Sequence, residues 1–270
     1  MATLAKYTRF IPHLAGNYPS LFYPLLGFCK GLPNRRTQGN TELTLEGYPR
    51  SGNTFAVRAF KYAQQRSVKL AHHLHVPAQV IQAARLGIPA CVIIREPEAT
   101  VRSLVLKYPY IPVWIALRGY ALFYETCWHY REHFVVADFN QVITDFGMVI
   151  DDINARFGTH FATFQHTRSN VERVFEKLDR KAIRADGGKV LGGFYPYPAR
   201  EQAKRVVNLA ASTRLLSRCR TIYDQFQALV RPCERQIEFA ERPDPAVGRG
   251  ELERPPAAMK QDTATAPYQA

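Results

Sequence analysis

Residues 47–54 read GYPRSGNT, and this octapeptide decides the fold that we expect for the chain. Leu43 and Leu45 alternate before it, as in a strand, and residues 53–65 after it are permissive for a helix. The sequence therefore predicts a strand, a tight turn and a helix. Such a turn directs backbone N–H groups, together with the partial positive charge of a helix N-terminus, at an anion.

The octapeptide differs from an ATP-binding P-loop at one decisive position. The lysine that pairs with the β- and γ-phosphates of ATP is replaced here by Asn53, and an arginine, Arg50, stands two residues before the second glycine. This pattern points away from metal-bound ATP. Glycine and proline also occur in turns that bind nothing, so for the octapeptide alone a purely structural turn is the alternative.

A second segment has a similar layout. Residues 89–94 form a short, largely β-branched run, which is followed by Arg95 and by a helix-like stretch that carries Ser103. Arg95 would stand at the carboxyl end of a buried strand, where open α/β sheets bind ligands, and Ser103 could reach the same anion. Considered alone, Arg95 could equally be a surface arginine in a loop. The two segments together predict two anion-binding positions.

Both segments together resemble the sulfotransferases that use 3'-phosphoadenosine 5'-phosphosulfate (PAPS). The first loop of that family reads Tyr-Pro-(Lys/Arg)-Ser-Gly-(Thr/Asn)-Thr, and its second site is an arginine with a serine eight positions later; both patterns are present here in order. The resemblance implies PAPS as the donor. It assigns the 5'-phosphosulfate to Arg50, Ser51, Gly52, Asn53 and Thr54, the 3'-phosphate to Arg95 and Ser103, and the adenine to the ring of Phe55.

Residues 68–77 read VKLAHHLHVP and supply a candidate base. Alternation along a strand would put His73 and His75 on one face. Family members carry their base in a Thr/Ser-His-Leu-Pro segment at this point, so the resemblance favours His75 as the catalytic base, with His73 as the alternative. Two histidines could also bind a metal, but no further ligand motif accompanies them, and we expect no metal.

Sulfuryl transfer explains these residue types. An acceptor hydroxyl or amine must lose its proton as it attacks sulfur, and histidine can take that proton near neutral pH. Negative charge grows on the leaving phosphate oxygens, so a fixed cation such as Arg50 would stabilise the transition state more than the ground state. We therefore expect Arg50 to be catalytic as well as donor-binding.

The remaining sequence predicts an α/β fold with a mostly parallel central sheet and helices on both faces. We expect an aromatic-rich helix over residues 112–133, a strand over 134–139 and a helix over 142–157. Asp138 either orients the loop or, more simply, caps the next helix. The expected organisation is an N-terminal extension packed on the domain (1–40), a catalytic domain (41–233) and a disordered tail (234–270).

Beyond residue 160 the resemblance fades, because the family's late motif Arg-Lys-Gly-x-x-Gly-Asp-Trp is absent. Lys189, with Gly192 and Gly193, is a distant substitute for it, and an ordinary turn is the alternative. Which residues of 160–233 close over the nucleotide is therefore open.

Charge and cysteine content restrict the partners. The net charge of the 270-residue chain is +13, which favours polyanionic ligands, and no nucleic-acid motif accompanies it. The acceptor is expected to be a small molecule, a lipid or a glycan, with peripheral membrane contact conceivable through residues 7–36. Five scattered cysteines and the lack of a long apolar segment suggest a cytoplasmic enzyme. The alternatives are a P-loop kinase or NTPase with a degenerate loop, and a non-catalytic anion-binding module.

Overall fold

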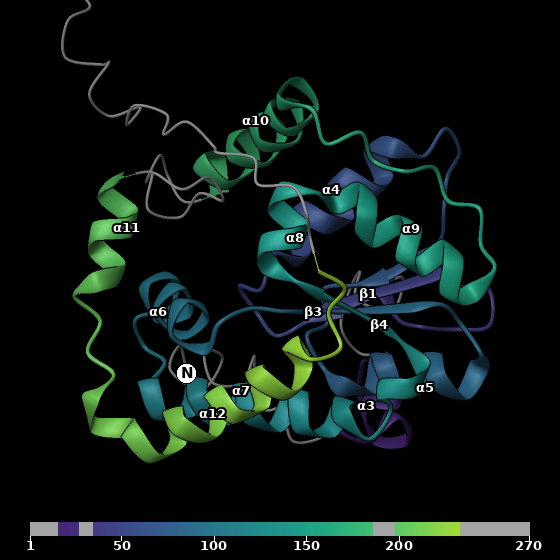
Figure 1. The fold of residues 1–270 in the computed structure, drawn as a ribbon. Coiled ribbons are helices and arrows are strands. Elements are labelled where there is room, and N and C mark those ends of the chain that lie inside the picture. The colour runs from purple at the N-terminus through teal and green to yellow at the C-terminus, as the bar shows by residue number, and fades with distance from the viewer. Residues whose placement is uncertain (1–15, 27–34, 186–197, 233–270) are drawn as a thin grey trace, which may run out of the picture.

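The computed structural model describes residues 16–26, 35–185 and 198–232. In this part of the chain one sheet of parallel strands, in the order β2-β1-β3-β4, is covered by helices on both faces (Figure 1), which confirms the expected α/β fold. The strands are β1 (Leu43–Gly47), β2 (Leu70–His72), β3 (Ala90–Ile94) and β4 (Val135–Asp138).

β1 lies between β2 and β3 in the sheet. Its Leu43 pairs with Leu70 of β2, and its Thr44 pairs with Ala90 of β3. Every residue of β1 and of β3 is buried, as expected for parallel strands that are covered on both faces. This burial explains why β3 reads as an unbroken apolar run in the sequence.

Two helical layers cover the sheet (Figure 1). One layer packs around α4, and the other packs around α7. The first contains α4 (Asn53–Ala63), α8 (Phe139–Thr144), α9 (Phe146–Phe157) and α10 (Arg168–Ala185). The second contains α3 (Pro19–Leu26), α5 (Pro77–Leu86), α6 (Pro97–Lys107), α7 (Val113–Trp128) and α12 (Thr213–Gln227), and α11 (Pro198–Arg205) contacts α6.

The strand order places a topological switch between β1 and β3. The chain runs from β1 through α4 to β2, and then crosses back past β1 through α5 to β3. The loops that follow β1 and β3 therefore lead to helices in opposite layers, α4 and α6. In open α/β sheets, ligands bind at such a point, outside the carboxyl ends of the strands. Residues 48–52 and Arg95 lie at this edge.

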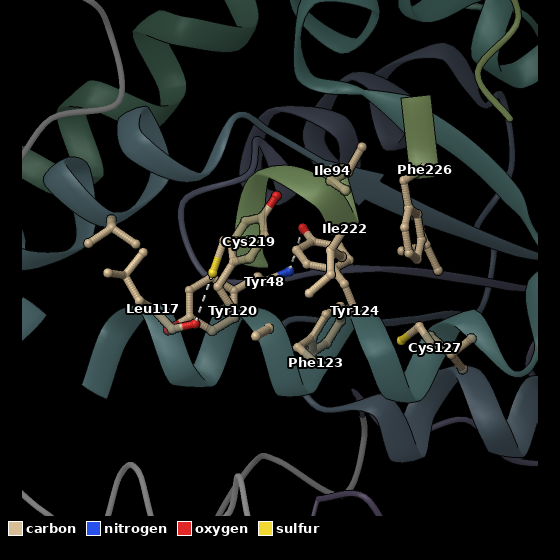
Figure 2. Close-up of a cluster of buried hydrophobic side chains, with 14 of the residues drawn as sticks. Tyr48, Ile94, Leu117, Tyr120, Phe123, Tyr124, Cys127, Cys219, Ile222 and Phe226 are labelled. Carbon is tan, nitrogen blue, oxygen red and sulfur yellow. Dashed lines mark hydrogen bonds between the residues drawn. The ribbon is translucent and has the colours of Figure 1, made fainter. Parts of the chain in front are cut away.

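The second layer contains an aromatic core beneath that edge. Figure 2 shows Tyr48, which directly follows β1, among Tyr120, Phe123 and Tyr124 of α7. The Tyr48 hydroxyl donates to the carbonyl of Ala116 at 2.8 Å, so the start of the loop is fixed to α7. Cys91, Cys127 and Cys219 are buried free thiols within the described residues.

Local capping explains where the helices after β4 begin. Asp138 forms a capping box, because its side chain accepts from Asn140 N–H and the Gln141 side chain accepts from the Asp138 N–H, which confirms the capping interpretation. The single helix expected over 142–157 is instead two, α8 and α9. Asp145 separates them, since its side chain accepts from Met148 N–H and starts a new helix.

The described part of the N-terminal segment contacts α5. The Ala78 N–H donates to the carbonyl of Gly16 at 2.7 Å, and the Thr37 N–H donates to Gln79 Oε1 at 2.6 Å. The proposed domain boundaries remain predictions, and residues 234–270 lie outside the described part. Within residues 16–26, 35–185 and 198–232, no helix has the length and apolar character needed to cross a membrane.

Candidate active site

The loop after β1 has an unusual backbone. Arg50 has φ 75° and Gly52 has φ 97°, both in the left-handed region, and the Ser51 N–H donates to the carbonyl of Tyr48. Left-handed backbone at a residue other than glycine costs about 1–3 kcal/mol and tends to occur at functional sites. Gly52 is the N-cap of α4 and gives its N-terminus no side-chain cap, so the first N–H groups of α4 are not capped in this way.

The two predicted anion-binding segments meet. Arg50 Nε donates to Ser103 Oγ at 3.0 Å, and Arg95 Nη1 donates to the backbone carbonyl of Arg50 at 3.2 Å. Ser103 is buried on α6. The loop after β1, the end of β3 and the helix α6 therefore converge on one place, with two guanidinium groups in it.

Arg95 is held from both sides. Its guanidinium carbon lies 3.8 Å from the centroid of the Phe139 ring, a cation–π contact, and its carbonyl accepts from the Tyr120 hydroxyl at 2.8 Å. Because these contacts fix its position, Arg95 is preorganised toward the loop that contains Arg50.

Ser51 and Asn53 have side chains that support the loop from within. Ser51 is buried, and its Oγ lies 3.1 Å from the Tyr124 hydroxyl. Asn53 Nδ2 donates to the carbonyls of Gly47 and Tyr48 at 3.3 and 3.1 Å. Any contact of these two residues with an anion would come from their backbone N–H groups.

The side chains of Thr54 and Phe55, neighbours at the start of α4, contact different parts of the protein. Thr54 Oγ1 lies 3.0 Å from His73 Nε2 and so connects α4 to the histidine segment. Phe55 is only 4% exposed, and its ring packs on Phe164, His166 and Phe175. Stacking on an adenine would require this ring to leave its protein neighbours, so the role of Phe55 stays a prediction.

The histidines lie in a turn rather than on the expected longer strand. β2 ends at His72, and His73 and His75 both have left-handed backbone, at φ 59° and 56°. Their ring centroids are nevertheless only 5.6 Å apart. Together with Arg50, they are the described residues other than glycine that have positive φ. The strained positions in the described chain are thus residues that the sequence singles out for chemistry.

The two candidate bases differ in their surroundings. Both ring nitrogens of His73 are engaged, Nδ1 with His72 Nδ1 at 2.8 Å and Nε2 with Thr54. Burial lowers the pKa of His73 to about 2 and that of His72 to about 4, so both stay neutral. His75 Nδ1 lies 2.8 Å from the carbonyl of Gly47. A carbonyl only accepts, so Nδ1 carries the proton and Nε2 is the basic nitrogen.

Metal ligands do not gather in the described part of the chain. No group of three or more His, Cys, Asp or Glu side chains there is arranged to hold a metal ion. Lys189, Gly192 and Gly193, the distant substitute for the family's late motif, lie outside the described residues.

Sequence reasoning missed two residues of the site, Glu46 and Tyr124. Glu46 is fully buried beside the histidine turn. Tyr124 accepts from the Tyr48 N–H at 3.3 Å and donates to the carbonyl of Ile93 at 2.8 Å, in addition to its contact with Ser51. A charged residue inside an apolar strand was the one available signal for Glu46. The aromatic sequence of α7 gives no such signal for Tyr124.

Tyr124→Phe should lower the free energy of unfolding by about 1–3 kcal/mol, because the buried N–H of Tyr48 and the carbonyl of Ile93 both lose their hydrogen bond to this hydroxyl. Denaturant unfolding measures this change. Tyr108→Phe is the control, since the Tyr108 hydroxyl makes no hydrogen bond within the described residues. Equal losses for the two variants would mean that the Tyr124 hydroxyl does not support the loop.

Comparison with known proteins adds one finding. No protein-family model and no curated protein matches the sequence. Among solved structures, the fold is similar to the crystal structure of mouse sulfotransferase SULT7A1 complexed with PAP, with a TM-score of 0.44 and 12% identity. That match covers 76% of this chain and 91% of the mouse chain.

Proposed function

We propose that this protein is a PAPS-dependent sulfotransferase. The observation that carries the proposal is the convergence of Arg50, Arg95 and Ser103 at the carboxyl ends of the adjacent strands β1 and β3. Two guanidinium groups beside a helix N-terminus that has no side-chain cap suit a ligand that carries two separate anionic groups. PAPS has a 5'-phosphosulfate and a 3'-phosphate, and the absence of the P-loop lysine at Asn53 disfavours ATP with magnesium.

In this proposal the two ends of the donor bind different parts of the site. The 5'-phosphosulfate lies against the backbone N–H groups of residues 51–54, with Arg50 beside them. The 3'-phosphate binds Arg95 and Ser103. The bond from Arg50 Nε to Ser103 Oγ connects these two positions, so donor binding would redirect the Arg50 side chain.

The reaction then follows from the position of His75. The acceptor oxygen or nitrogen attacks sulfur and gives its proton to His75 Nε2, while the bond from sulfur to the bridging phosphate oxygen breaks. Adenosine 3',5'-bisphosphate (PAP) leaves with the electron pair of that bond. Arg50 and the helix N-terminus stabilise the charge that develops on the leaving oxygen. No step requires a metal.

His75 suits the role of base better than His73. Both nitrogens of the His73 ring are engaged inside the protein, and burial disfavours its protonated form. The His75 side chain is 24% exposed, and its Nδ1 is bonded to the last residue of β1, directly before the anion loop. The base is thereby tied to the loop that would hold the transferred group.

The acceptor is proposed to be a hydroxyl or amine of a small molecule, a lipid or a glycan. The buried free thiols of Cys91, Cys127 and Cys219 favour a reducing compartment, so we propose the cytoplasm as the site of action.

Thermal stabilisation by nucleotides tests the proposed donor. PAP should raise the midpoint of unfolding, with stabilisation of about 2.7 kcal/mol at a concentration one hundred times its dissociation constant, and ATP with magnesium should do so far less. Acceptors are then screened with labelled PAPS. Preferential stabilisation by ATP with magnesium would favour a kinase or NTPase, and indifference to both nucleotides would contradict the proposed donor site.

A further inference from the structure

Glu46 is a buried carboxylate next to the proposed base. It belongs to β1, is 0% exposed and points to the sheet face that α5 covers. Its Oε1 accepts from the Leu74 N–H at 2.9 Å, and its Oε2 accepts from the His75 N–H at 3.1 Å. The side chain of Gln79 also donates to Oε1, at 3.4 Å. Among the described residues, the groups that hydrogen-bond to this carboxyl are N–H donors, as expected for the ionised form.

Glu46 contacts the turn at residues 73–75, whose backbone conformation is rare for residues other than glycine. His73 and His75 flank Leu74 with left-handed backbone, a conformation that persists only when the surroundings impose it. The Glu46 carboxylate accepts hydrogen bonds from the N–H groups of Leu74 and His75, so it stabilises this turn from the side of the sheet. Without the carboxylate, both N–H groups would be left unpaired next to a buried strand.

The same carboxylate acts on the His75 ring. Its Oε2 lies 3.8 Å from His75 Nδ1, beyond hydrogen-bond distance but close enough for attraction to an imidazolium. The other charged groups that act on the neighbouring histidines are the cations Arg35, Arg58 and Lys61. Burial raises the pKa of the Glu46 carboxyl above its ordinary value, and the neighbouring His75 acts in the opposite direction.

We propose that Glu46 is a positioning residue that holds His75 with its proton on Nδ1, bonded to the Gly47 carbonyl, and with Nε2 available to take the proton of the acceptor. The role of His75 as base rests on the proposed function, whereas its orientation by Glu46 does not. A carboxylate that orients a histidine, and stabilises the charge that the histidine gains, is an effective arrangement for general-base chemistry.

The test reads the tautomer of His75 directly, in the uniformly ¹⁵N-labelled full chain. Long-range ¹H–¹⁵N correlation spectra should show the His75 proton on Nδ1, with signals assigned by comparison with His75→Gln. In Glu46→Gln, one backbone N–H meets an amide NH₂ instead of an oxygen, so a mixture of tautomers is expected. Glu42→Gln is the matched control. Glu42 also accepts a backbone N–H, from Lys69 at 3.0 Å, but it lies at the opposite end of the strand and is paired with Arg66.

A kinetic readout accompanies the spectra. Once an acceptor is known, Glu46→Gln should lower kcat by about 10–100-fold, by analogy with residues that orient the histidine ligands of metal sites, with the KM for PAPS unchanged. A spectrum of Glu46→Gln in which His75 keeps only the Nδ1 proton would overturn the proposal.

Two measurements on the unaltered protein keep the test decisive if Glu46→Gln fails to fold. The amides of Leu74 and His75 should exchange slowly with solvent, and His75 should carry its proton on Nδ1. Fast exchange of both amides, or a proton on Nε2, overturns the proposal without any variant. None of these spectra needs donor or acceptor, so a failure to find sulfuryl transfer would reject the proposed function and leave this result intact.

Discussion

Replacing His75 with glutamine should lower the rate of sulfuryl transfer by about 10²- to 10⁴-fold, the usual contribution of a general base. PAP binding should stay unchanged, because His75 contacts the loop through the Gly47 carbonyl and does not bind the phosphates in the proposed arrangement. The measurement is single-turnover transfer from labelled PAPS to an acceptor found by screening, alongside calorimetric binding of PAP.

Two further histidine variants sharpen this result. His160→Gln is the control, because His160 is exposed and lies in the connection between α9 and α10. His73→Gln tests the alternative base. A large loss of turnover in His73→Gln combined with a normal rate in His75→Gln would assign the catalytic role to His73 and contradict the role of His75 as base.

Arg50→Ala and Arg95→Ala should have different effects, the first on kcat and the second on PAP binding. Arg50→Ala should lower kcat by about 10²- to 10³-fold, as is typical when one donor to a developing negative charge is removed. Arg95→Ala should chiefly weaken PAP binding, by about 1.5–3 kcal/mol, the range for hydrogen bonds to charged groups. The physical difference is that Arg50 would act on charge that grows during the reaction, whereas the 3'-phosphate near Arg95 keeps its charge throughout.

The contact between the two arginines requires controls. Arg95 also donates to the Arg50 carbonyl, so its loss could loosen the loop. Ser103→Ala removes a partner of the 3'-phosphate and leaves Arg95 in place, and it should weaken PAP binding with little change in kcat. Arg131→Ala, a surface arginine near Trp128, should change neither quantity. Equal and small effects from Arg50→Ala and Arg95→Ala would contradict both roles.

The sequence predicts the strands and helices around the site well, because these elements depend on local patterns. Alternating leucines, a glycine-rich turn and a helix-permissive stretch are adjacent in the chain, and they form β1, the loop and α4 where expected. The apolar run of β3 and the cap formed by Asp138 are local signals of the same kind.

The supports of the site could not be predicted, because they join distant residues. The Tyr124 hydroxyl reaches Ser51, 73 positions away, only because α7 packs under the loop. Glu46 reaches the amides of Leu74 and His75 only because β2 pairs beside β1. His73 and His75 have left-handed backbone on either side of Leu74, whose N–H donates to that buried carboxylate, and no residue pattern marks this turn in advance.

The most direct test of the central claim is a crystal structure of the protein with bound PAP. We expect the 5'-phosphate against the backbone N–H groups of residues 51–54 and the 3'-phosphate within hydrogen-bond distance of Arg95 and Ser103. A bisphosphate bound elsewhere, or one that leaves either Arg50 or Arg95 without contact to a phosphate, would contradict the account.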